Sequence, residues 1–443
     1  MLSERLVTSA MRFYNKSYLA QDPVELGMMP SPRPGRNYVL YAHVPFCERL
    51  CPYCSFNRFL YAEPRARSYF KALRGEMRMV ADLGYDFASL YIGGGTPTIL
   101  LDELCETIDI ARQLFPGIKE VSAETSPNLL NDETIDVLCD RVQRFSVGVQ
   151  SFDDGLLAQM ARRDKYGTSE QVFEAVRAAV GKFHSLNVDM IFNFPSQTME
   201  MLERDIELVK ATGANQTTFY PLMVSPKNRR QIKVDIGAVD FERERDYYET
   251  ICDGLTPDFK PGSAWTFSRE AGGLIDEYIV DYEEYLGIGS GALSFIEDRI
   301  YGNTFSLREY ERRIASGSMS VCKRGMEYKG KARMRYRFVT DLFGLRLDKQ
   351  RFLKDFGMPV ERGLRLELAF MKAVGGIATD NEREITLTDK GRYLLLVMMR
   401  EMLAASNDLR DQARATLPLD EKMLLFESRE SCATQLEECL AAS

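Results

Sequence analysis

The sequence lacks any long apolar run and any excess of basic residues. The longest fully apolar stretch runs from Tyr393 to Met399, far shorter than the roughly 20 residues that a helix needs to span a bilayer. The 57 lysines and arginines are outnumbered by 65 aspartates and glutamates, which gives a net charge of −8. This balance argues against a broad nucleic-acid-binding surface. The composition predicts a cytoplasmic globular protein without nucleic-acid partners, and peripheral contact with the inner face of a membrane remains open.

Histidine is scarce, and a second group of closely spaced cysteines is absent. His43 and His184 are the only histidines, and six of the nine cysteines are scattered singly: Cys105, Cys139, Cys252, Cys322, Cys432 and Cys439. A structural zinc site usually takes four ligands in two pairs, so zinc is the less favoured alternative. Disulfides are disfavoured as well, because the spacing is irregular and no secretory signal precedes the first cysteines.

The other three cysteines form a compact motif. Cys47, Cys51 and Cys54 lie within eight residues, at spacings of three and then two. Three thiolates spaced in this way can hold one face of an iron–sulfur cluster, and a cubane with three cysteine ligands leaves one iron open to a small molecule. The motif therefore predicts a cluster that takes part in chemistry rather than one that only carries electrons.

The chain is long enough for two or three domains. Residues 1–36 end in several prolines and a glycine and are predicted to be an extension or linker. Residues 37–304 are predicted to form the main domain, and residues 305–443 a smaller, mainly helical C-terminal domain. Within the latter, a short strand from Ile385, a cap at Thr388 and a buried helix are expected.

Six short apolar segments of the main domain predict strands that alternate with helices. The predicted strands are Tyr38–Val44, Ser89–Gly93, Glu120–Glu124, Phe145–Gln150, Val188–Phe194 and Gln216–Leu222. The predicted helices between them include Arg67–Leu83, Asp102–Leu114, Ser169–Phe183 and Thr198–Thr212. Near-continuous apolar strands that alternate with amphipathic helices indicate a parallel sheet covered by helices. Six such repeats predict an α/β fold, a partial (β/α)6 barrel of the TIM type.

Unusual polar residues stand where the predicted strands end. The cysteines follow the first strand, and Gly93-Gly-Gly-Thr-Pro-Thr98 follows the second. Glu124 and Gln150 end the third and fourth strands, and Asp189 lies in the fifth. Because reactive groups of such barrels gather at the carboxyl ends of the strands, we expect these residues to line one site.

These motifs resemble those of the radical S-adenosylmethionine (SAM) superfamily. The spaced cysteines and the glycine run carry the broad resemblance. The oxygen-independent coproporphyrinogen III oxidase-like branch is similar in narrower segments: Tyr41-Ala-His-Val-Pro-Phe-Cys47, Phe145-Ser-Val-Gly-Val-Gln-Ser-Phe152 and Tyr285-Leu-Gly-Ile-Gly-Ser-Gly-Ala292. The resemblance spans roughly residues 38–400.

The resemblance implies two cofactors and a set of residues that bind them. Cys47, Cys51 and Cys54 would hold a 4Fe-4S cluster. Tyr41, Gly94 and Glu124 would contact one SAM, which is cleaved to a 5′-deoxyadenosyl radical. A second SAM would lie beside it, and the positions matched to it are Tyr53, Gly95, Thr96, Gln150, Arg162 and Asp189. Leu222 is a further cofactor-binding position, without assignment to either SAM. The alternatives are a plain barrel turn at the glycines and structural hydrogen bonding by Gln150 and Asp189. The resemblance assigns no catalytic base.

Finer details are similar to the menaquinone C-8 methyltransferases of the branch. They include Tyr53-Cys-Ser-Phe-Asn-Arg-Phe59 and Thr217-Thr-Phe-Tyr-Pro-Leu-Met223. Phe56 stands where the coproporphyrinogen oxidases usually carry a fourth cysteine. The resemblance thus implies a radical SAM methyltransferase that uses two SAM molecules to methylate C-8 of menaquinone.

The expected partners are a prenylated quinone or a porphyrin, and a reducing electron donor such as flavodoxin or ferredoxin. The segment Cys322–Arg337 holds seven basic residues, which suit anionic lipid headgroups, porphyrin carboxylates or solvent. Two alternatives remain: a coproporphyrinogen III oxidase or other porphyrin-acting enzyme, and a non-catalytic haem-delivery protein. The scarcity of histidine disfavours the last.

Overall fold

The predicted strands assemble into the sheet that surrounds the site. The computed structural model describes residues 2–23, 29–225, 229–270 and 284–425. Six strands pair in parallel and in chain order: β2 (Tyr38–Val44), β5 (Ser89–Gly94), β6 (Glu120–Thr125), β7 (Arg144–Gln150), β8 (Ser185–Phe192) and β9 (Gln216–Pro221). Their side chains are almost wholly buried, as expected for a parallel sheet covered on both faces. The prediction of a partial barrel is confirmed.

A seventh parallel strand comes from much later in the chain. β12 (Glu284–Ile288) pairs with β2, and Leu286 lies opposite Leu40. Antiparallel strands extend both edges: β13 (Leu293–Ile296), β14 (Arg299–Asn303), β15 (Val321–Gly325) and β1 (Gln21–Pro23) on one side, β11 (Thr266–Ser268) and β10 (Lys260–Pro261) on the other. In the described part of the chain, β1 and β10 end this sheet and are not paired with each other, so the barrel stays open.

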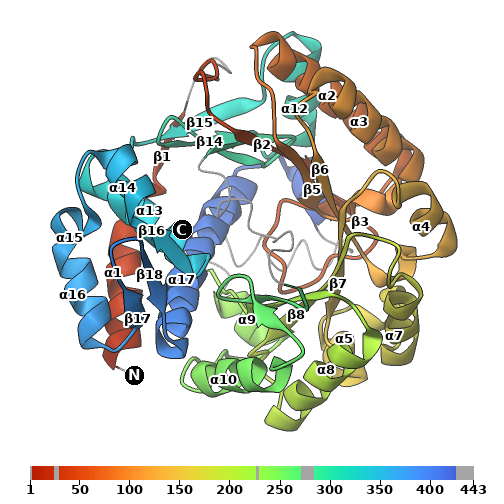
Figure 1. The fold of residues 1–443 in the computed structure, drawn as a ribbon. Coiled ribbons are helices and arrows are strands. Elements are labelled where there is room, and N and C mark those ends of the chain that lie inside the picture. The colour runs from red at the N-terminus through yellow and green to blue at the C-terminus, as the bar shows by residue number, and fades with distance from the viewer. Residues whose placement is uncertain (1, 24–28, 226–228, 271–283, 426–443) are drawn as a thin grey trace.

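Helices cover the outside of the sheet (Figure 1). The helices of this part of the chain are α2 (Glu63–Asp82), α3 (Leu101–Leu114), α4 (Asp132–Leu138), α5 (Asp154–Gln159), α6 (Arg163–Tyr166), α7 (Ser169–Ala178), α8 (Met199–Thr212), α9 (Arg229–Asp235) and α10 (Glu244–Leu255), with short 3-10 turns η1 (Pro97–Ile99) and η2 (Pro127–Leu129). Phe70, Leu73, Met77 and Val80 of α2 are fully buried, because residues three or four apart share one face of a helix.

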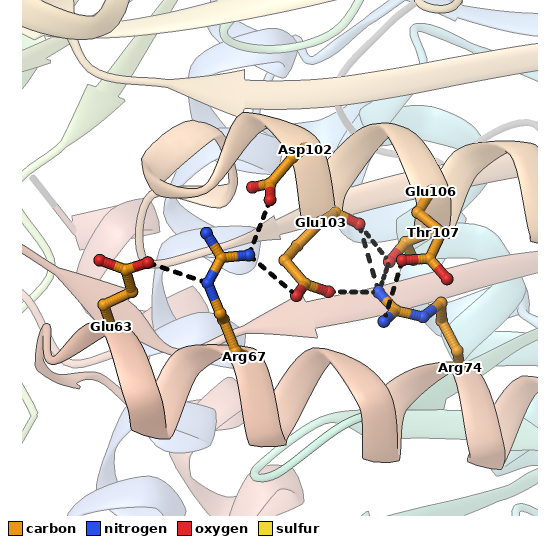
Figure 2. A network of polar contacts seen from close by, with 7 residues as sticks. All are labelled: Glu63, Arg67, Arg74, Asp102, Glu103, Glu106 and Thr107. Atoms are coloured by element: carbon orange, nitrogen blue, oxygen red, sulfur yellow. Dashed lines mark hydrogen bonds and ion pairs between the residues drawn. The ribbon is translucent and has the colours of Figure 1, made fainter.

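A polar network ties α2 to α3 on the outer surface (Figure 2). Arg74 pairs with Glu103 at 2.6 Å, and both side chains are about nine-tenths buried. Arg67, which is much more exposed, contacts Glu63, Asp102 and Glu103. The carboxylates gather in the first turns of α3, where the helix dipole favours negative charge.

The C-terminal part adds helices and a small separate sheet. The helices are α12 (Leu307–Ala315), α13 (Lys331–Phe343), α14 (Lys349–Phe356), α15 (Val360–Gly363), α16 (Arg365–Ala373), α17 (Asp389–Ala415) and α18 (Leu419–Lys422), followed by η3 (Met423–Leu425). The sheet orders β16 (Arg346–Asp348), β18 (Glu384–Leu387) and β17 (Ile377–Asp380). The predicted cap is confirmed, because Thr388 Oγ1 accepts a bond from Gly391 N at 3.1 Å at the start of α17.

The two ends of the described chain meet at α17. α1 (Leu2–Tyr18) packs along it, and Asn15 Nδ2 donates to the Glu401 carbonyl at 3.0 Å. The first part of the expected linker is therefore a helix, followed by strand β1. The division at residues 304 and 305 stays a prediction, and β15, beyond it, still belongs to the large sheet. None of the helices in the described ranges is long and apolar enough to cross a bilayer.

Candidate active site

One cavity of about 440 Å³ lies at the carboxyl ends of the parallel strands. The three clustered cysteines and all ten residues matched to SAM line it: Tyr41, Tyr53, Gly94, Gly95, Thr96, Glu124, Gln150, Arg162, Asp189 and Leu222. The volume is within the range of ligand-binding pockets. The separate motifs therefore meet in space as expected. Their roles in binding cofactors stay predictions.

The cysteines sit on a loop that is closed at its base. Cys47 ends the short strand β3 (Phe46–Cys47), which pairs with β4 (Phe59–Leu60). Inside the loop, Arg58 is buried and donates through Nη2 to the carbonyls of Cys51 and Cys54. The guanidinium thus fixes the loop from within and adds positive charge beside the thiols.

The role of the three thiols as cluster ligands stays a prediction. All three are free and face the same cavity. In the described ranges no three His, Cys, Asp or Glu side chains converge on a point that a single ion would occupy, as zinc requires. Burial raises the pKa of Cys47 to about 12, the charge of Cys54 adds to this, and Arg58 opposes it. Binding of iron at Cys47 would therefore release a proton.

His43 has a structural role behind the cysteine loop. Its Nε2 lies 2.7 Å from the Asn57 carbonyl and its Nδ1 lies 2.9 Å from the Tyr41 hydroxyl. Burial lowers the pKa of His43 to about 4, so the ring is neutral at pH 7. Since a carbonyl only accepts, the proton lies on Nε2, and Nδ1 accepts from Tyr41.

The glycine run passes too close to its neighbours for side chains. A Cβ on Gly95 would lie 2.5 Å from the Phe46 carbonyl oxygen. Gly94 has a φ of +119°, and a Cβ there would lie 2.5 Å from the His43 ring. Glycine is therefore required for β5 to end against the cysteine loop, and this contact brings the two motifs together.

Glu124 is held in one orientation at the end of β6. Its Oε1 accepts from the Tyr91 hydroxyl at 2.8 Å, and its Oε2 accepts from Gly94 N at 3.0 Å. A Cβ on Gly93 would overlap this carboxylate at 2.6 Å. The carboxylate is thus pre-positioned at the cavity wall and keeps acceptor capacity for a ligand.

Gln150 lies in a strained turn that a buried carboxylate supports. Its φ is +76°, and the pairing of β7 with β8 shifts register between Gly148 and Gln150. Asp205 of α8 accepts from Phe152 N at 2.7 Å and from the Ser151 hydroxyl at 2.9 Å. These bonds hold the chain directly after Gln150 and compensate the unfavourable conformation.

Arg162 and Asp189 reach the cavity already hydrogen-bonded. Arg162 is buried, its Nη1 lies 3.6 Å from Cys51 Sγ, and its Nη2 donates to the Gly148 carbonyl. Its Nε is buried and has no hydrogen-bond partner among the described residues. Asp189 accepts from Ser146 at 2.6 Å and from Asn187 at 2.7 Å. Both side chains are therefore held by hydrogen bonds before a ligand binds. The Nε–H of Arg162 could still donate to an acceptor atom of a ligand.

Most of the opposite wall of the cavity lies outside the sequence motifs, and Tyr285, the first residue of the segment Tyr285–Ala292, is the exception. Its side chains come from β12, β13, α13, the segment before α13 and α17: Tyr285, Phe295, Tyr328, Tyr336, Met399, Met402, Leu403 and Arg410. Stacked rings add rigidity, with 4.4 Å between the centroids of Phe295 and Tyr336. Figure 1 shows α17 on the side that the sheet leaves open. Amphipathicity alone could not reveal that the apolar face of α17 covers a cavity.

Comparison with known proteins agrees with this geometry. A protein-family model described as "Radical SAM superfamily" matches residues 41–209 of the chain. The heme chaperone HemW of Lactococcus lactis is 30% identical over 61% of this chain and 73% of its own length. The oxygen-independent coproporphyrinogen III oxidase of Paracoccus denitrificans is 26% identical over 82% of this chain and 85% of its own length.

The chain belongs to the radical SAM superfamily, in its coproporphyrinogen oxidase-like branch. Membership implies a 4Fe-4S cluster and SAM as cofactors. The fold agrees: the solved coproporphyrinogen III oxidase (HemN) of Escherichia coli superposes with a TM-score of 0.70 over 90% of this chain and 98% of that one, at 21% identity.

The prediction of a menaquinone C-8 methyltransferase is wrong. The relatives that match most of this radical SAM chain are named as heme chaperones and coproporphyrinogen III oxidases, not as C-methyltransferases. The motifs that suggested methyl transfer, around Tyr53 and Tyr220, line the same cavity but were a poor guide to the substrate.

Proposed function

We propose that this radical SAM protein is an enzyme that acts on a tetrapyrrole of the porphyrin type. The observation that carries the proposal is the cavity, which joins the cysteine loop on one wall to an aromatic and apolar surface on the other. When bound, the cluster supplies the electron that splits SAM into methionine and a 5′-deoxyadenosyl radical, which removes a hydrogen atom from a substrate. A reduced flavodoxin or ferredoxin is the proposed electron donor.

The polar wall suits binding of SAM beside the cluster. Cys47, Cys51 and Cys54 would hold the iron, and Glu124, already aligned by Tyr91 and Gly94, would accept bonds from ribose hydroxyls or the ammonium group. The amide of Gln150 and the buried Arg162 lie on the same wall. Because a guanidinium pairs well with a carboxylate, we propose a second SAM there, with Arg162 facing its methionine part.

The opposite wall suits a large flat ring. Its rings, such as Phe295 and Tyr336, are joined in the cavity lining by Tyr220 and Trp265 of the barrel, whose ring centroids lie 5.3 Å apart. Aromatic and thioether side chains pack on a π-system without directional hydrogen bonds, so this wall fits a tetrapyrrole ring better than a small polar molecule.

The basic segment offers little support for membrane contact. Of its seven basic residues, five form ion pairs with acidic side chains: Lys329, Lys331, Arg333, Arg335 and Arg337. Since the local charge is largely neutralised, the attraction to anionic lipid is small. These pairs hold α13 against its neighbours instead.

The test is turnover under anaerobic conditions. Protein reconstituted with iron and sulfide receives SAM, dithionite and coproporphyrinogen III, and 5′-deoxyadenosine and tetrapyrrole products are measured by mass spectrometry. We expect the tetrapyrrole to be converted and to stimulate release of 5′-deoxyadenosine, and Cys51→Ala to abolish both. Iron-loaded protein that releases 5′-deoxyadenosine but converts neither coproporphyrinogen III nor haem would contradict the proposal.

Haem delivery without turnover is the second candidate, because several relatives bear the name heme chaperone. Within the described residues the histidines do not favour it. Both ring nitrogens of His43 are engaged, and His184 is exposed just before β8, at the end of the strand away from the cavity. Stoichiometric binding of haem that stays intact with SAM and reductant, without 5′-deoxyadenosine, would favour this candidate.

A further inference from the structure

One cation lies on the apolar wall of the cavity. Arg410 belongs to α17 and borders the cavity together with Met399, Met402 and Leu403 of the same helix. No motif of the sequence singled it out. A charged group among apolar side chains costs free energy unless a partner offsets it, so its contacts decide its role.

The contacts of Arg410 leave most of its guanidinium available. Its Nη1 donates to Asn407 Oδ1 at 2.8 Å, and its Cζ lies 4.9 Å from the ring centroid of Phe56. Within the described ranges, no carboxylate lies within ion-pair distance of it. The other arginines around the cysteine loop are engaged: Arg414 pairs with Asp411 and donates to the Phe56 carbonyl, and Arg58 binds loop carbonyls.

The charge of Arg410 acts across the cavity. It adds to burial, the main cause, in lowering the pKa of His43. Burial raises the pKa of Tyr285 to about 12, and the charge of Arg410 acts in the opposite direction. Both residues stand on neighbouring strands, β2 and β12, so the guanidinium of Arg410 is close enough to affect groups on both strands.

We infer that Arg410 binds a carboxylate of the substrate and thereby selects acids over neutral analogues. The inference rests on the proposed function and adds to it the group that is recognised. A planar guanidinium presents paired N–H groups to a carboxylate, and Phe56 and Asn407 hold it in place from behind. A flat ring against Tyr285 and Tyr336 would then reach toward the cysteine loop while its acid stays at α17.

The test compares an acid with its ester. Coproporphyrin III and its tetramethyl ester are titrated anaerobically, in the same detergent buffer, into the full-length cluster-loaded protein with SAM, and quenching of porphyrin fluorescence gives each Kd. Loss of one charge-assisted contact corresponds to about tenfold to hundredfold in affinity. We expect Arg410→Gln to weaken the acid by that factor and the ester by less than twofold, and Arg410→Lys to restore part of the preference.

Phe56→Leu tests the support of Arg410 separately. It removes the ring beneath the guanidinium, and we expect it to weaken the acid by a smaller factor than Arg410→Gln does. If Arg410→Gln keeps the acid preference, or weakens acid and ester equally, the inference about Arg410 fails while the proposed function stands. If the wild type binds neither compound, the tetrapyrrole proposal itself fails and this inference falls with it.

Discussion

The two walls of the cavity differ in the interactions that hold their side chains. On the barrel wall, polar groups such as Glu124 and Asp189 are fixed by hydrogen bonds before any ligand arrives. On the C-terminal wall, aromatic and aliphatic side chains dominate, and Arg410 is the charged group among them. If the barrel wall holds the cofactors and the C-terminal wall the substrate, as proposed above, variants on the two walls should have separable effects.

Cys51→Ala should have the largest effect. With two thiols left on the loop, the cluster loses one of its three ligands, so we expect loss of the iron–sulfur absorbance and at least a hundredfold loss of SAM cleavage. Iron and sulfide content together with 5′-deoxyadenosine release measure this. Cys105→Ala, on the outer helix α3, is the matched control and should retain both.

Arg162→Ala should affect the barrel wall selectively. If Arg162 faces the second SAM, binding stoichiometry by equilibrium dialysis should fall from two toward one, with slower turnover. The first SAM should still be cleaved when substrate is absent. An equal loss of both binding events would show instead that Arg162 mainly supports the cysteine loop through its contact with Cys51.

Leu403→Gln should affect only the C-terminal wall. The change keeps the size and helix propensity of the residue but adds a polar group where the ring would pack. Burial of a leucine is worth roughly 1.5–3 kcal/mol, so we expect about a tenfold higher KM for the tetrapyrrole. Cleavage of SAM without substrate should be unchanged. If SAM cleavage fell together with tetrapyrrole binding, the two walls would not act separately.

Asp205→Asn should change the pH dependence of stability. Burial raises the pKa of Asp205 to about 7, above its unfolded value of about 3.9. The wild type therefore gains stability from the protonated acid below pH 4 and loses it as the pH rises to 7. Between pH 5 and 8 we expect roughly 2 kcal/mol of this loss, and the variant should lack it in urea unfolding.

Arg74→Met should leave both walls and the activity unchanged. It breaks a buried ion pair and leaves Glu103 with Arg67 as its ion-pair partner, so we expect a loss in the free energy of unfolding below the roughly 3–5 kcal/mol of a fully unpaired buried charge. The exposed Arg67, changed in the same way, should lower the free energy of unfolding much less. Changed substrate KM in the folded Arg74 variant would show that the outer helices influence the cavity.

The sequence determined the barrel and most of the polar wall. Strand periodicity predicted β2 and β5–β9 to within a few residues, because fully buried parallel strands require continuous apolar runs. The cysteine spacing (Cys47, Cys51 and Cys54) and the glycine run at Gly93 are local sequence motifs, so they can be recognised without knowledge of the fold. The convergence of these motifs followed from the rule that strand ends meet at one edge.

The apolar wall of the cavity depends on contacts between segments far apart in the sequence, and its role in function could not be predicted without the fold. α17 reads as an ordinary buried helix, and its contact with the cavity depends on packing against α1 and α13, far away in sequence. Arg410 is one of many arginines until the fold places it beside Phe56. The methyltransferase prediction rested on short local motifs, which carry no information on the contacts between distant segments that shape the apolar wall.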